Sequence, residues 1–137
     1  MQIIITLPGI PRTKKNSPRV VERKGKPVVL PSKAYETYCN KCLNYLRRCK
    51  MPKDILPIKE PVNVMVLYYM PTNRRVDLPN LLNATDDILV DAGILADDNS
   101  DIVMAHDGSR VYKGEEYPRA VVYIQTQESW NIINAKV

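Results

Sequence analysis

Aspartates gather in one stretch of the chain, directly after a pair of arginines. Arg74 and Arg75 precede Asp77, and two aspartate doublets follow at positions 86–87 and 97–98. Carboxylate oxygens are ligands that Mg²⁺ accepts, and the arginine fork matches the geometry of phosphate oxygens. These residue types, placed so close together, predict a divalent metal that works on a polyanion.

The charges of the chain are divided unevenly along its length. Residues 1–75 hold 16 Lys and Arg against 4 Asp and Glu, whereas residues 76–137 hold 4 against 11. The sequence pI is near 9.1. A basic half of this kind fits a phosphate backbone, although surplus lysines often only solvate a surface. We therefore expect nucleic acid as the partner.

One predicted helix positions the first aspartates. Apolar side chains at 78, 81, 82, 85, 88, 89 and 92 follow the spacing of a single helix face, and the stripe ends at Gly93. Asp77 is then a natural N-cap, and Pro79 is tolerated because it lies in the first turn.

The polar face of this helix predicts a metal site. Asn80, Asn83 and Asp87 share that face, and Asp98 lies in the following loop, where it can fold back beside the helix. Two or three aspartates that converge from the helix start, its face and the loop suffice for Mg²⁺.

A simpler alternative assigns these carboxylates no chemistry. Asp77 then only caps the helix, Asp86 and Asp91 only improve solubility, and residues 97–101 form a polar turn.

The cysteines allow a second metal hypothesis. Cys39 and Cys42 form a C-x-x-C pair, Cys49 follows, and His106 is the one histidine. The chain therefore has enough ligands for one Cys₃His zinc site. The cysteines also fall on one apolar face of a helix predicted over residues 32–50 with Ser32 as its N-cap. We therefore expect reduced thiols packed in the core.

The remaining elements predict one α+β domain over residues 1–137. Strands are expected at 2–7, 62–70, 101–105, 110–113 and 119–125, with a basic-tipped hairpin around residues 20–29. This order predicts a mixed or antiparallel sheet with the two main helices packed on one side. The chain has no apolar run long enough to span a membrane, so we expect a cytoplasmic protein.

Several motifs together resemble the RusA family of Holliday-junction resolvases, found in bacteria and their prophages. The resemblance covers roughly residues 2–126. It is carried by Ile5-Thr6-Leu7-Pro8-Gly9-x-Pro11 with the following Lys-Lys-Asn, the Leu30–Tyr35 helix entry, Arg-Arg-x-Asp-Leu-x-Asn-Leu at 74–81, Asp87-Ile-Leu, Ala92-Gly93-x-Leu95-x-Asp97-Asp98 and the closing strand region.

The resemblance implies a homodimeric endodeoxyribonuclease that depends on Mg²⁺ or Mn²⁺ and makes paired nicks in four-way DNA junctions during recombination, repair or phage DNA processing. It uses neither a nucleotide cofactor nor a membrane. Two of the family's metal-binding aspartates correspond to Asp77 and Asp98. The third falls on Pro79, and the family's catalytic lysine falls on Asn83.

Other residues of the chain can fill these two gaps. We expect Asp87 to serve as the third catalytic and metal-binding aspartate, or His106 to approach the metal. The missing cation is expected from Lys14, Lys15 or Arg75, or from the second subunit of the homodimer. DNA binding is assigned to Lys14, Lys15, Arg19, Arg74 and Arg75. The alternative is a protein of the same fold that binds branched DNA and has lost or altered cleavage.

Overall fold

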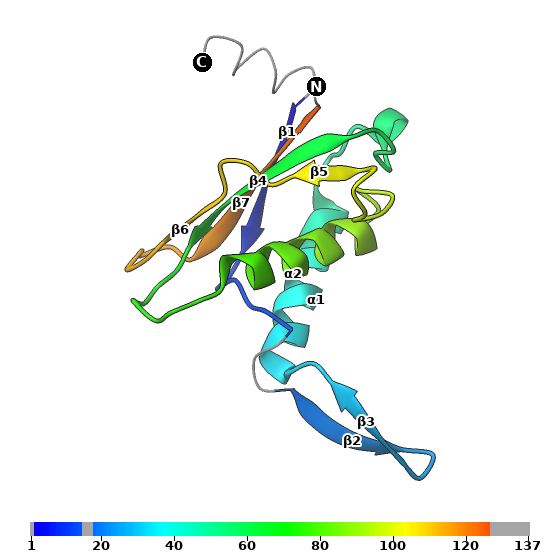
Figure 1. Cartoon of the computed structure of the whole chain (residues 1–137), viewed down its shortest axis with the longest axis vertical. Helices are drawn as coiled ribbons and strands as arrows, with labels where there is room; N and C mark the ends of the chain where they lie inside the picture. The colour runs from blue at the N-terminus through cyan, green and yellow to red at the C-terminus, as the bar shows by residue number, and fades with distance from the viewer. Residues whose placement is uncertain (1, 15–17, 127–137) are drawn as a thin grey trace.

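Two helices and a five-stranded sheet form the body of the protein (Figure 1). The computed structural model describes residues 2–14 and 18–126. The elements are β1 (Gln2–Pro8), β2 (Arg19–Arg23), β3 (Lys26–Leu30), α1 (Lys33–Arg48), the 3₁₀ helix η1 (Lys53–Ile55), β4 (Val62–Tyr69), α2 (Leu78–Asp91), β5 (Val103–Ala105), β6 (Arg110–Tyr112) and β7 (Arg119–Thr126).

The sheet has a mixed topology. β7 lies between β1 and β4 and is antiparallel to both. β5 and β6 both pair in parallel with β4, β5 near its start and β6 near its end. The predicted α+β class with a mixed sheet is therefore confirmed.

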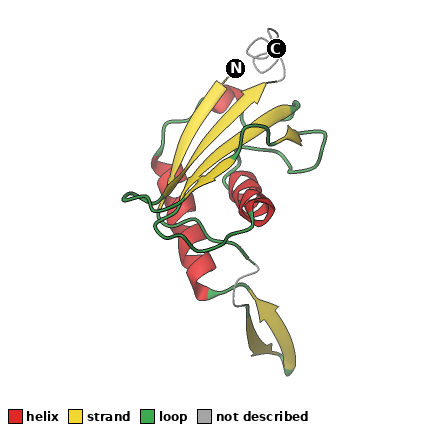
Figure 2. Cartoon of the chain, turned by 60° about the vertical axis from the view of Figure 1, so that its left-hand side comes forward, coloured by secondary structure: helices red, strands yellow, loops and turns green. Residues whose placement is uncertain are grey.

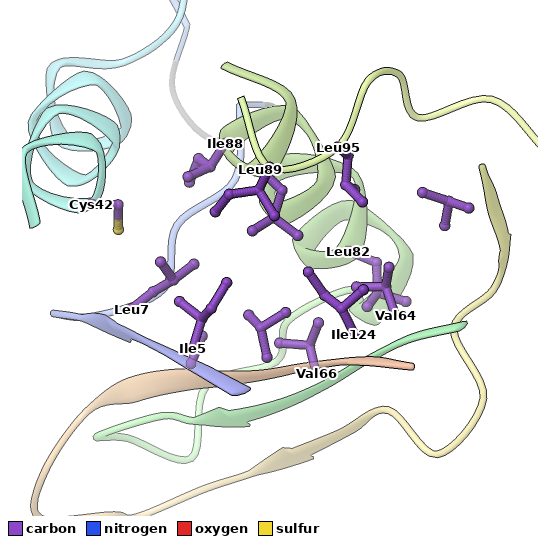
Figure 3. Close-up of a cluster of buried hydrophobic side chains, with 14 of the residues drawn as sticks. Ile5, Leu7, Cys42, Val64, Val66, Leu82, Ile88, Leu89, Leu95 and Ile124 are labelled. Atoms are coloured by element: carbon purple, nitrogen blue, oxygen red, sulfur yellow. The ribbon is translucent and has the colours of Figure 1, made fainter. Parts of the chain in front are cut away.

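Both helices pack on one face of this sheet, as predicted (Figure 3). Alternate residues of the central strands point to that face and are buried, as the two-residue period of a strand requires. They meet the apolar stripe of α2, where Ile88 and Leu89 are almost fully buried. The opposite face is not covered by either helix, and Ile4 there is 60% exposed.

α1 begins and ends as the sequence indicates. The Ser32 hydroxyl accepts a hydrogen bond from Tyr35 N at 3.2 Å, and two arginines occupy the last turn. Cys42 is fully buried and lies over β1, where its thiol donates to Pro8 O at 3.9 Å. Packing of this thiol in the core is thus confirmed, while Cys39 and Cys49 are half-buried.

The hairpin of β2 and β3 projects away from the body beyond the start of α1 (Figure 2). Its two-residue turn is Lys24-Gly25, with positive φ at both positions, as a tight hairpin requires. Arg19 anchors its base: the guanidinium donates to Glu36 Oε2 at 2.6 Å and to Pro31 O at 3.1 Å.

Within the described part of the chain, no helix has the length and apolar character needed to cross a membrane.

Candidate metal and nucleic-acid site

Asp77 stands at the N-cap of α2, but its side chain does not cap the helix. A capping carboxylate accepts from the second or third backbone N–H of the helix. The second residue is Pro79, which has no N–H, and the third, Asn80, donates its backbone N–H to the carbonyl of Asp77. The exposed carboxylate instead accepts from Asn80 Nδ2 at 3.3 Å. Pro79 therefore leaves Asp77 open to a solvent-side ligand, contrary to the capping role predicted from the sequence.

A cavity of about 550 Å³ lies at the same end of α2. Its lining includes three arginines, Arg12 from the loop after β1 and Arg74 and Arg75 from the loop before α2. Thr13 and Thr72 add hydroxyl groups to the wall. Three guanidinium groups around one hollow form a site for an anion, and phosphate matches their fork geometry.

Lys14 extends from the loop after β1 to the polar face of α2. Its Nζ forms an ion pair with Asp87 Oδ2, across 73 residues of sequence. The same lysine lines a smaller cavity of about 160 Å³ with Asn80, Asn83 and Ala84. Lys14 thus brings an ammonium group to the helix face that holds Asn83. The resemblance to the RusA family leads one to expect a lysine at position 83.

Asp98 lies in the loop beyond the far end of α2. Its backbone N–H donates to Asp97 Oδ1 at 2.7 Å. Partial desolvation raises the pKa of Asp98, a hydrogen bond with the Asp97 side chain raises it further, and the charge of Asp87 adds to the shift. The carboxylates of Asp87 and Asp98 therefore repel each other, a repulsion that a bound cation relieves.

The three predicted aspartates do not meet at one point. Ten residues of helix separate Asp77 from Asp87, which corresponds to about 15 Å along the axis. Ile58, just before β4, bonds to Ile94 and Ala96, whereas Asp77 follows the opposite end of β4. Within residues 2–14 and 18–126, no three His, Cys, Asp or Glu side chains form a metal-binding group.

Two carboxylates are nevertheless a donor set that Mg²⁺ accepts, because this ion keeps several waters and also binds substrate phosphates. Asp87 and Asp98 fit that requirement in the chemistry of their oxygens, and the charge of Asp87 contributes to the raised pKa of Asp98. Asp77 lies apart from them, beside the arginine cavity.

The position of Asp86 contradicts the simpler alternative from the sequence, in which this side chain only improves solubility. The side chain is buried, with 4% exposure, and its Oδ2 lies 2.8 Å from His106 Nε2. The fold places Asp86 on the flank of α2 that faces the end of β5. The lone histidine is therefore held by Asp86. The sequence contained a partial signal, since Asp86 sits between the apolar and polar faces of the helix.

The remaining predicted cations have different surroundings. Arg19 is bound within the chain by Glu36 and Pro31, which favours a structural role at the base of the hairpin. Lys15 lies outside the described residues. Arg12, which the sequence did not single out, joins Arg74 and Arg75 in the cavity wall. Only the tertiary fold reveals that position.

No protein-family model matches the chain, and no curated protein matches it.

Proposed function

We propose that the chain is a metal-dependent endodeoxyribonuclease that cleaves branched DNA, with the four-way junction as its substrate. One observation carries the proposal: the arginine cavity lies beside an open aspartate at the start of α2, and Lys14 pairs with Asp87 further along the same helix. The cations can bind phosphate, and the carboxylates can bind a metal. Both kinds of side chain lie along α2, and we call this line of residues from the arginine cavity to Asp87 the α2 track. The RusA resemblance supports the choice of substrate.

The two ends of the track have different tasks. The arginine cavity holds a backbone phosphate and fixes the position of the strand, without reading its sequence. About 15 Å separates Asp77 from Asp87, which spans about four steps of one DNA strand at 3.4 Å each. A strand that follows α2 therefore reaches from the arginines to the Asp87 end.

Cleavage is assigned to the Asp87 end. Asp87 and Asp98 would hold Mg²⁺ or Mn²⁺, which supplies an activated water and Lewis-acid stabilisation of the phosphodiester. Lys14 places its ammonium group at the same carboxylate and neutralises charge that develops on the phosphate oxygens. Asn80 and Asn83 offer amide hydrogens to the backbone between the two ends.

Paired nicks require two such tracks, so the proposal includes a homodimer. A twofold axis presents the same site to two strands of a junction, which is itself close to twofold symmetric. The basic tip of the β2–β3 hairpin, with Arg23, Lys24 and Lys26 exposed, extends the cationic surface of each copy.

The test is nicking of an end-labelled synthetic four-way junction in Mg²⁺ and then in Mn²⁺. We expect symmetric nicks from the natural protein and a loss of at least about a hundredfold in the Asp87→Asn and Asp98→Asn variants. Asp91→Asn is the matched control, because Asp91 is exposed on the same helix and outside the predicted site. Equal nicking by all four proteins contradicts the assignment of the metal site.

A second function is favoured by one specific observation. Among the described residues the three aspartates do not form a three-ligand group, and Pro79 cannot bind a metal. A protein of this kind binds branched DNA through the arginine cavity and leaves it intact. Tight junction binding without nicks in either metal, lost in Arg75→Ala, identifies this second function.

A further inference from the structure

Three side chains form a stacked column on the face of the sheet that the helices leave open. Tyr69 of β4 pairs in register with Tyr112 of β6 on one side and with Arg119 of β7 on the other. The two tyrosine rings lie 5.2 Å apart at 17°, and the Arg119 guanidinium lies 3.9 Å above the ring of Tyr69. The neighbouring Tyr68 is buried against Thr85 of α2, so Tyr69 points to the opposite face.

The column ends at an exposed ring. Both faces of Tyr69 are occupied, one by Tyr112 and the other by Arg119. Tyr112 lies on the edge strand β6 and is 36% exposed. Among residues 2–14 and 18–126, no second ring stacks on it. Cross-strand packing accounts for Tyr69, whereas the Tyr112 side chain stays partly exposed at the edge of the sheet.

A further cation lies beside the exposed ring. Arg110 is two residues before Tyr112 on the same strand, so both side chains point to the same face, and Arg110 is exposed. An aromatic ring with a neighbouring cation is the combination that binds single-stranded nucleic acid: the base stacks on the ring, and the cation pairs with the phosphate.

The column and the arginine cavity adjoin the same end of β4. Met70, the residue after Tyr69, donates its backbone N–H to Tyr112 O at 2.8 Å. Met70, Pro71 and Thr72 then line the cavity that holds Arg74 and Arg75. The cavity, which Leu81 of α2 also lines, lies on the helix side of the sheet, whereas the column lies on the open face. A DNA strand bound in the cavity would therefore reach the ring of Tyr112 by crossing this end of the sheet.

We propose that Tyr112 is a stacking site for an unpaired nucleobase at the branch point of the DNA. The inference rests on the proposed function, because the cavity supplies the phosphate contact that brings the base to the ring. Duplex arms keep their bases stacked on each other, whereas a branch point interrupts that stack, so a base that is unpaired there offers a free face to the ring. Stacking on an aromatic face tolerates any base, which suits recognition by shape rather than by sequence.

The first experiment measures affinity in EDTA for a junction with two unpaired thymines at its branch point, and for a plain duplex. Tyr112→Ala should weaken junction binding at least about fivefold, the lower range for loss of one stacked base. Tyr112→Phe should stay within about twofold, and duplex binding should not change. Tyr117→Ala is the matched control, because Tyr117 is 71% exposed and outside the column.

The second experiment uses the natural protein and so does not depend on how the variants fold. A 5-iodouracil at the branch point is irradiated in the complex, and the cross-linked residue is mapped by mass spectrometry. We expect Tyr112. A cross-link only to other residues, or equal junction affinity for Tyr112→Ala and the natural protein, overturns the stacking site.

The Arg75→Ala variant separates failure of this inference from failure of the proposed function. If Arg75→Ala weakens binding to both DNAs while Tyr112→Ala changes neither, the cavity binds DNA and the stacking site is wrong. If the natural protein binds neither DNA, both the stacking site and the proposed function are wrong.

Discussion

His106 Nε2 lies 2.8 Å from Oδ2 of Asp86, and this contact joins the end of β5 to the flank of α2. The other carboxylate oxygen of Asp86 is buried without a hydrogen-bond partner among the described residues. The imidazole is therefore the one hydrogen-bond partner of this carboxylate among the described residues. His106 is accordingly expected to contribute to stability.

Replacement of His106 by alanine should lower the free energy of unfolding by about 1–3 kcal/mol, because it leaves Asp86 buried without its partner. Urea unfolding of His106→Ala, Asp86→Ala and the double variant measures the coupling. The double variant should lose less than the two single losses combined. Asp91→Ala, on the exposed face, should stay within about 0.5 kcal/mol of the natural protein. Strict additivity at 86 and 106 contradicts the coupling.

Replacement of Lys14 by methionine should strengthen cation binding and weaken cleavage. In the natural protein the Lys14 ammonium group forms an ion pair with Asp87. Its loss frees that carboxylate, together with Asp98, to bind a metal. The expected gain in Mn²⁺ affinity is about two- to fivefold, since a partly exposed ion pair contributes up to about 1 kcal/mol. Electron paramagnetic resonance of free Mn²⁺ measures it. Lys53→Met in η1 is the control, and an unchanged affinity in Lys14→Met removes Asp87 from the metal site.

The hairpin tip should contribute to DNA affinity through charge alone. In a Lys24→Ala/Lys26→Ala variant, the slope of log affinity against log salt should fall by about 0.9 for each duplex phosphate that the tip no longer neutralises. Fluorescence anisotropy between about 50 and 200 mM salt, the range where counterion release dominates, gives the slope. A slope equal to that of Lys53→Ala shows that the tip does not touch DNA.

Stability should fall in alkaline solution. Burial raises the pKa of Cys42 from 9.0 to about 11, and burial also raises the pKa values of Tyr38 and Tyr68. The folded protein thus holds these protons more tightly than the unfolded chain. The contribution of Cys42 is complete below pH 9 and is lost as the pH rises toward 11. The contribution of the two tyrosines is complete below their ordinary pKa of 10.0 and declines above it. Melting temperatures from about pH 7 to about pH 11 test this, and Cys42→Ala should show a shallower decline.

Local patterns predicted the elements of the fold. The spacing of apolar residues predicted α2, and Ser32 marked the start of α1. The hairpin was predicted from the valine pairs on either side of its basic tip. Each of these signals depends on residues a few positions apart. The class of the sheet followed from the order of the elements.

The sequence predicted the long-range contacts of the site less well. Lys14 and Asp87 are 73 residues apart, so the sequence offered Lys14 only as one of three possible cations. Asp86 was misread because helical periodicity places it beside the polar face, and only the tertiary fold brings His106, directly after β5, against that flank. Asp77 and Asp98 are separated because residues 94–96 form backbone hydrogen bonds with Ile58, just before β4, whereas Asp77 follows the other end of that strand. No local sequence pattern indicates these bonds.

Two short strands share one edge of β4, and this restricts how the sheets of two molecules can join. β5 pairs only with the start of β4 and β6 only with its end, and between them the Ser109 hydroxyl accepts a hydrogen bond from Val66 N at 3.0 Å. This margin offers no long row of free backbone groups to another strand, which protects it from edge-to-edge aggregation. Among the described strands of the main sheet, β1 forms the other margin and runs unbroken for seven residues. A continuous sheet across two molecules would therefore form through β1.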